Sequence, residues 1–180
     1  MRKAVGVLVA LAVTLPFGVL AASGAGAAGG TSCASGAGSA TFTPPLPDLS
    51  SKVKVKDVLK SSGTVAGCTG SVKSGTLTGV SAVSTGSNCL SIATPTTTPT
   101  KITLTVKWNT GATSTIPAQL KDIPHVAVTT QTVSGTVSAG LFKGSKLSGK
   151  FTYSLPAGAC SKGHPLAKVT YKDVGATVIK

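Results

Sequence analysis

Few side chains in this 180-residue chain could carry out catalysis, and only one pair of them lies close in sequence. Asp122 and His125 occur in the stretch Lys-Asp-Ile-Pro-His, and with one of the many serines they could form a nucleophilic triad. However, no serine lies in a G-x-S-x-G elbow, the strained turn that exposes such a nucleophile. A histidine beside a proline turn is usually a surface loop residue. We therefore expect no catalytic residues and a protein that is not an enzyme, with a hydrolase as the third functional hypothesis.

The sequence lacks the residue patterns that usually bind metals and cofactors. The second histidine, His164, is far from His125 in sequence, and no C-x-x-C pair is present. There is neither a Walker loop nor a G-x-G-x-x-G segment to bind phosphate groups. We expect no metal site and no cofactor.

The four cysteines fit a pair of disulfides, for which three connectivities are open: Cys33, Cys68, Cys89 and Cys160. If a strand at 39–43 runs one way and the chain from Lys52 returns, Cys33 and Cys68 lie at the same end. The following strand then runs toward Cys89, which leaves Cys89 to pair with Cys160, because bridged Cα atoms must lie close together. We favour Cys33–Cys68 and Cys89–Cys160 as purely structural bridges.

Lysine is the dominant charged residue, and the full chain carries a formal charge of +13. Beyond residue 27 there are fifteen lysines and four aspartates, with no arginine and no glutamate. This charge favours anionic partners such as envelope polymers. Specific nucleic-acid recognition is not expected, because it relies on arginine forks and on aromatic side chains interleaved with basic ones.

Four lysines form the sharpest surface feature: Lys52, Lys54, Lys56 and Lys60. Alternation with Val53 and Val55 predicts a half-buried strand whose lysines face solvent. These lysines are our candidate contacts for a polyanion. The alternative is a solvated or edge strand that is charged to prevent pairing between molecules.

Residues 1–27 have the pattern of a secretory signal peptide, which leaves 28–180 as one secreted domain. Met1-Arg2-Lys3 is positively charged, 4–22 is apolar, and Ala25-Gly26-Ala27 matches a small-x-small cleavage site. A retained membrane anchor is the alternative, since the apolar stretch is nearly long enough to span a bilayer. We expect no other membrane segment after cleavage, and an extracellular or envelope-associated location.

Period-2 alternation of apolar and polar residues continues along the rest of the chain. It is clearest at 101–108, where it places Trp108 in the core rather than on a sugar-binding surface, and a hairpin turn follows at 109–112. Further strands are predicted within 126–137, 147–155 and 169–178, a proline-rich turn at 44–47, and an exposed crossover at 94–100. No segment has helical periodicity. The chain is therefore predicted to be all-β, a single antiparallel sandwich or barrel-like domain, with an immunoglobulin-like arrangement among the options.

A Ser-Gly-Thr phrase occurs three times, at 62–64, 74–76 and 134–136. A repeat fold needs a fixed period, and these spacings are unequal. We attribute the phrase to compositional bias at strand bends.

Several local features together carry a family resemblance. They are the signal peptide, Cys33, the stretch Thr41-Phe42-Thr43-Pro44-Pro45-Leu46, Gly67-Cys68, Lys107-Trp108-Asn109-Thr110-Gly111 and the late Cys160. Over residues 28–180 the chain resembles a group of small secreted proteins of unassigned function from high-GC Gram-positive, actinobacterial-type bacteria. The resemblance implies a host class and an envelope setting, and it transfers no catalytic residue.

Taken together, these features predict a secreted non-catalytic β-domain that acts at or outside the cell envelope. Its expected partner is an anionic envelope polymer or another protein, and its oligomeric state is left open. The alternative function is an inhibitor of extracellular hydrolases that uses an exposed loop at 89–100.

Overall fold

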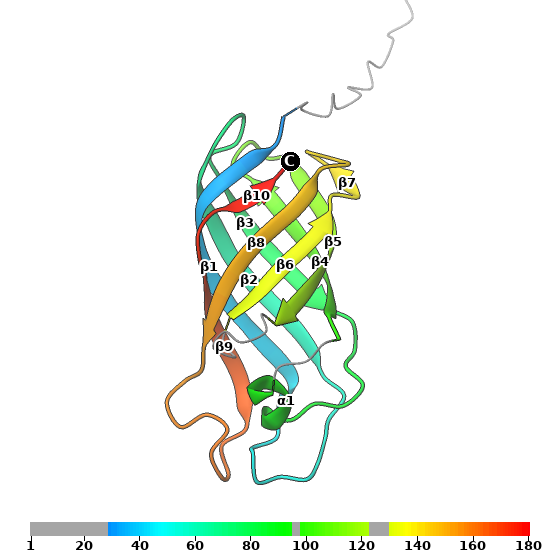
Figure 1. Cartoon of the computed structure of the whole chain (residues 1–180), viewed down its shortest axis with the longest axis vertical. Helices are drawn as coiled ribbons and strands as arrows, with labels where there is room; N and C mark the ends of the chain where they lie inside the picture. The colour runs from blue at the N-terminus through cyan, green and yellow to red at the C-terminus, as the bar shows by residue number, and fades with distance from the viewer. Residues whose placement is uncertain (1–28, 95–97, 123–129) are drawn as a thin grey trace, which may run out of the picture.

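The alternating segments form an antiparallel sheet that closes on itself (Figure 1). The computed structural model describes residues 29–94, 98–122 and 130–180. The elements are β1 (Thr31–Leu46), β2 (Val58–Cys68), β3 (Ser74–Ser81), α1 (Cys89–Ala93), β4 (Thr100–Trp108), β5 (Thr113–Asp122), β6 (Thr130–Thr136), β7 (Ala139–Gly140), β8 (Lys146–Ser154), β9 (Leu166–Asp173) and β10 (Thr177–Ile179).

Each main strand pairs antiparallel with the next one along the chain, in the order β1-β2-β3-β4-β5-β6-β8-β9. β9 pairs back with β1, with Gly38 opposite Tyr171, and this pairing closes an eight-stranded barrel. β10 extends the last strand by pairing with both β1 and β8, and β7 pairs with β5. The predicted single antiparallel β-domain is confirmed in its barrel-like form. The sandwich and immunoglobulin-like options are not confirmed, because the pairing gives one closed sheet rather than two packed ones.

Alternation decides which side chains enter the barrel. In β4, Ile102, Leu104 and Val106 are buried, whereas the intervening lysines and Thr103 are exposed. The predicted turn after this strand is confirmed: the Trp108 amide donates to the Ala112 carbonyl at 2.8 Å. In β4, alternation therefore predicted the buried side correctly.

One end of the barrel is filled by a packed core, at the β7 end in Figure 1. The Trp108 and Phe142 rings meet edge to face with centroids 5.6 Å apart. The Trp108 Nε1 donates to Ser114 Oγ at 2.8 Å, which satisfies the indole of a side chain only 3% exposed. The predicted core position of Trp108 is confirmed.

Both predicted disulfides are present, Cys33–Cys68 and Cys89–Cys160. Cys33 lies directly opposite Cys68 in the β1–β2 ladder, at the packed end. The second bridge lies at the other end of the barrel, beside α1. The argument from strand direction identified both pairs correctly.

Three local predictions were wrong. Residues 52–56 form a loop with one isolated bridge at Val55, and Val53 is 61% exposed, so no half-buried strand forms there. Pro44 and Pro45 continue β1 through an irregularity in its pairing instead of forming a turn. The short helix α1 was not expected, since five residues are too few to show helical periodicity.

Two other predicted segments are described only in part. Of the predicted strand at 126–137, the portion before Thr130 lies outside the described residues, as do 95–97 of the predicted crossover. The structure shows no helix in the described ranges that is long and apolar enough to cross a membrane.

Candidate functional site

The barrel interior contains a cavity of about 630 Å³ between the packed end and α1. Space for it arises because inward positions on β1 to β3 carry small residues: Gly36, Gly38, Ala40, Ser61, Gly63 and Gly79. An eight-stranded barrel has an interior that is either filled by its own side chains or able to hold one small ligand. This barrel combines the two, with a packed end and an open middle.

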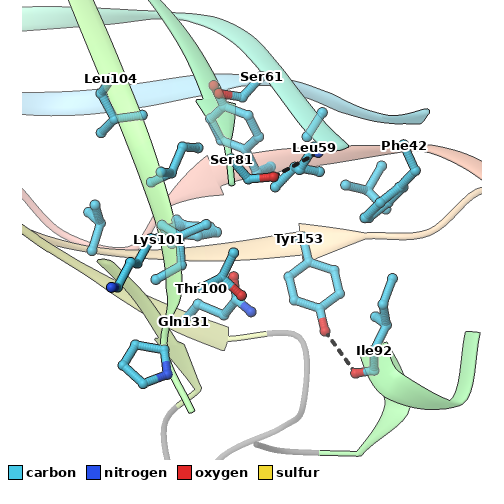
Figure 2. A pocket seen from close by; sticks show the side chains of 18 of the residues that line it. Phe42, Leu59, Ser61, Ser81, Ile92, Thr100, Lys101, Leu104, Gln131 and Tyr153 are labelled. Carbon is cyan, nitrogen blue, oxygen red and sulfur yellow. Dashed lines mark hydrogen bonds between the residues drawn. The ribbon is translucent and has the colours of Figure 1, made fainter. Parts of the chain in front are cut away.

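One wall of the cavity is apolar. It comes mainly from β2 to β5, and its side chains include Leu59, Val65, Leu77, Ile102, Leu104 and Leu120. Phe42 of β1 and Ile92 of α1 extend this surface toward the α1 end (Figure 2). Such a wall favours the apolar part of a ligand by removing it from water.

The opposite wall, from β5 to β9, carries polar and aromatic side chains. The strand register places Asp122 opposite Gln131, and Gln131 opposite Phe151. Phe151 in turn lies opposite Asp173. Tyr153 and Tyr171 form the next inward pair on β8 and β9, so a tyrosine pair lies beside this row of four side chains.

Hydrogen bonds hold several of these groups in place. Gln131 Nε2 donates to Asp122 Oδ1 at 2.8 Å, and Thr177 Oγ1 donates to Asp173 Oδ2 at 2.7 Å. The Tyr153 hydroxyl donates to the Ile92 carbonyl at 3.3 Å, which links the cavity wall to α1 (Figure 2). The polar wall is therefore organised before any ligand enters.

Burial sets the protonation of this wall. It raises the pKa of Asp173, while the hydrogen bond from Thr177 acts in the opposite direction. Burial and the nearby Asp173 charge raise the pKa of Tyr171 to about 12. Burial and Asp122 do the same for Tyr153, also to about 12. Both phenols therefore stay neutral hydrogen-bonding groups throughout the physiological pH range.

Two buried hydroxyl oxygens in this part of the molecule have no hydrogen-bond partner among the described residues, Ser61 Oγ and Tyr171 Oη. The Tyr171 hydroxyl lies over Gly38 and Gly63, where an added Cβ would be 2.5 Å from it. An unsatisfied buried hydroxyl typically costs about 1–3 kcal/mol. Both hydroxyls belong to residues that line the cavity.

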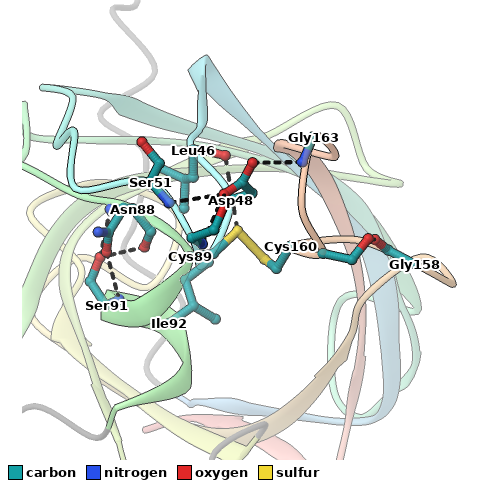
Figure 3. Close-up of a disulfide and its surroundings, with 12 residues drawn as sticks. Leu46, Asp48, Ser51, Asn88, Cys89, Ser91, Ile92, Gly158, Cys160 and Gly163 are labelled. Carbon is teal, nitrogen blue, oxygen red and sulfur yellow. Dashed lines mark hydrogen bonds between the residues drawn. A yellow bond between two sulfur atoms is a disulfide. The ribbon is translucent and has the colours of Figure 1, made fainter.

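The α1 end of the cavity is tied together by covalent and polar links (Figure 3). Cys89, the first residue of α1, is bonded to Cys160 in the loop between β8 and β9. Asp48 Oδ2 accepts from the Gly163 amide at 2.7 Å, which joins the same loop to the chain after β1. Asn88 caps α1, with the Ser91 amide donating to its side chain. The helix is thereby anchored beside the cavity.

The predicted polyanion contacts do not share one strand face. Lys52, Lys54 and Lys56 lie in the loop between β1 and β2, and Lys60 lies on the outer face of β2. All four are exposed. Their role as contacts for an anionic polymer stays a prediction.

The residues considered for catalysis are only partly described. Asp122 lines the cavity, whereas His125 lies outside the described residues, so the geometry of the hypothetical triad stays open. His164 is exposed in a loop, as expected. Within the described ranges, no three His, Cys, Asp or Glu side chains gather as a metal-binding group. The inhibitor loop at 89–100 begins with α1, and 95–97 are outside the described ranges.

Sequence reasoning missed the residues that define this cavity, above all Phe151, Tyr171 and Asp173. Their signal was nevertheless present. Val169, Tyr171 and Asp173 alternate in one strand, so an inward Val169 puts the aspartate on the inner face. What alternation could not show is that the inner face borders a cavity.

No family model, curated protein or solved structure matches this chain. Its class is accordingly defined by its own architecture: a closed antiparallel barrel with an internal cavity and a disulfide-anchored helix at one end.

Proposed function

We propose that this protein is a secreted, non-catalytic binding protein that holds a small, largely apolar molecule inside its barrel. The cavity carries this proposal. Its volume of about 630 Å³ lies within the range of pockets that bind drug-sized molecules, about 300–1,000 Å³. Its lining also follows the usual composition of such pockets, an apolar surface with a few placed polar groups.

Secretion is the cellular setting of the proposal. The signal-peptide pattern of residues 1–27 supports it, and so do the two disulfides, which persist in oxidising compartments. A disulfide-bonded barrel suits a carrier or sequestering protein, because the two bridges stabilise the fold that encloses the cavity.

The experiment compares two tryptophan substitutions in neighbouring residues of β5. Leu120 lines the cavity, whereas Gln119 is exposed on the outer face. We expect the purified secreted protein to bind the neutral apolar dye Nile red with enhanced fluorescence. Leu120→Trp should weaken that binding at least about tenfold by filling the space, while Gln119→Trp should leave it unchanged.

Thermal denaturation checks that both variants fold, because overpacking a core costs about 1–3 kcal/mol. If Leu120→Trp unfolds, Val133→Phe on the facing position of β6 serves as the second cavity-filling variant. Dye binding that survives in folded cavity-filling variants, or no binding by the unmodified protein, contradicts the proposal.

A second function, attachment to an anionic envelope polymer, is favoured by the separation of charge. All fifteen lysines beyond residue 27 are exposed, whereas Asp57, Asp122 and Asp173 line the cavity. Asp48 is the remaining aspartate, so the outer surface is almost uniformly cationic. Retention on anionic cell-wall polymer at low ionic strength, lost as salt is added, is the expected behaviour.

A further inference from the structure

We propose that the molecule bound in the barrel carries a positively charged nitrogen on an apolar body, and that Asp173 and the neighbouring aromatic rings hold that nitrogen. This inference rests on the proposed function, because it specifies the chemistry of the ligand for the same cavity. It follows from where the charged and aromatic side chains lie.

Negative charge is concentrated inside a protein whose outside is positive. Three of the four aspartates line the cavity, and Lys101 is the single lysine among the described residues that line it. A buried carboxylate is costly unless it is paired or well hydrogen-bonded. A cationic ligand supplies the missing charge, whereas an anionic one would add to the repulsion.

Asp173 is the best placed of the three carboxylates. Among the described residues, Thr177 is its one hydrogen-bond donor, at 2.7 Å to Oδ2. An ionised carboxylate accepts several hydrogen bonds, so most of its acceptor capacity is open to the N–H groups of an amine. In contrast, Asp122 is already engaged by Gln131, and Asp57 by Ser84.

Aromatic rings lie beside this carboxylate. Phe151 is opposite Asp173 across the β8–β9 ladder, and Tyr171 is two residues before it in β9. The two rings meet edge to face with centroids 5.9 Å apart. Ring faces attract cations, and the attraction grows where water is excluded.

The aromatic side chains are also concentrated around the cavity. Of the six aromatic residues beyond the signal segment, four line it: Phe42, Phe151, Tyr153 and Tyr171. The other two, Trp108 and Phe142, fill the packed end. Carboxylates and aromatic rings on one wall, with an aliphatic wall opposite, match an amphipathic amine with an alkyl or aryl body.

The test uses three ligands with the same ten-carbon chain and different head groups: decylamine, decanol and decanoate. At pH 7 these are cationic, neutral and anionic respectively. Displacement of Nile red from the purified secreted protein measures each affinity below the concentration at which the ligands aggregate. We expect decylamine to bind about tenfold or more tightly than decanol, and decanoate to bind most weakly.

Two matched aspartate substitutions assign the effect to its residue. Asp173→Asn should reduce decylamine affinity about tenfold and leave decanol affinity unchanged. Asp48→Asn removes a carboxylate that does not line the cavity and should change neither affinity. A single cooperative melting transition for each variant shows that it is folded.

The outcomes separate this inference from the function on which it rests. Equal affinities for the three ligands, or tightest binding of decanoate, overturn the cationic ligand but leave a cavity-binding protein. Equal weakening of decylamine and decanol by Asp173→Asn also overturns it, since loss of a charge-assisted contact should weaken the cationic ligand more than the neutral one. Binding of none of the three, together with no Nile red binding, removes both proposals.

Discussion

At the scale of single residues, Asp48 and Asp173 have opposite surroundings. Asp48 lies outside the cavity and accepts hydrogen bonds from the Ser50 hydroxyl and the Gly163 amide, which lower its pKa. Burial raises the pKa of Asp173. The two aspartates therefore make opposite contributions to the pH dependence of the folding free energy.

We predict opposite pH profiles for two aspartate-to-asparagine variants. The raised pKa of Asp173 gives stability that is present below its ordinary value of 3.8 and lost as pH rises through the folded-state value. Relative to the unmodified protein, Asp173→Asn should therefore become progressively more stable as the pH rises from 3 to 7. For Asp48, stability is present above 3.8 and lost as pH falls, so Asp48→Asn should be less stable at pH 7 and indistinguishable at low pH.

Melting temperatures measured every half pH unit check both profiles. Parallel shifts of the two variants, in either direction, would show that their surroundings do not act as the hydrogen bonds and burial indicate.

At the scale of the elements, the three Ser-Gly-Thr phrases have a packing explanation that composition does not supply. Gly63 in β2, Gly75 in β3 and Gly135 in β6 all lie on inward positions. A Cβ added at Gly63 would be 2.5 Å from both the Tyr171 hydroxyl and the Ala37 carbonyl oxygen. At Gly135 it would be 2.4 Å from the Pro117 carbonyl oxygen. These glycines let neighbouring backbones and side chains approach closely inside the barrel.

We predict that Gly63→Ala destabilises the barrel by about 1–3 kcal/mol, because the added methyl group overpacks the interior. Ser62→Ala, one residue earlier on the outer face, should change stability by less than about 0.5 kcal/mol. Chemical denaturation of the two variants measures the difference. A Gly63→Ala protein as stable as Ser62→Ala would mean that the strands move apart without cost.

At the scale of the whole molecule, positive and negative charges occupy different places. Lysines cover the outside, while most carboxylates face the cavity. Such a field attracts polyanions over distances of about a Debye length, about 8 Å at physiological ionic strength. The two functions that we propose, attachment to an anionic surface and binding of a small ligand, would therefore use different faces of the same sheet.

We predict that the lysines at the two ends of the barrel contribute unequally to the binding of an anionic polymer. Replacing Lys52, Lys54, Lys56 and Lys60 by glutamine should lower the salt concentration that elutes the protein from such a polymer. The same change at Lys107, Lys143, Lys146 and Lys180, which are exposed at or near the packed end, should lower it less. Equal shifts for the two sets would show diffuse attraction by net charge, and no retention at low ionic strength would exclude attachment altogether.

The amino-acid sequence alone predicted most of the strands, the buried side of most of them and the favoured disulfide pairs. These properties depend on alternation and on strand direction, and both are local: Ile102, Leu104 and Val106 are apolar in step with the pleat. The tertiary structure decided closure, because it depends on the pairing of Gly38 with Tyr171, residues far apart in the chain. Closure encloses the inner face, and the small inward residues of β1 to β3 leave a cavity there. Pairing of β8 with β9 places Asp173, whose inward position the sequence contained, beside Phe151, and the surrounding barrel partly buries it.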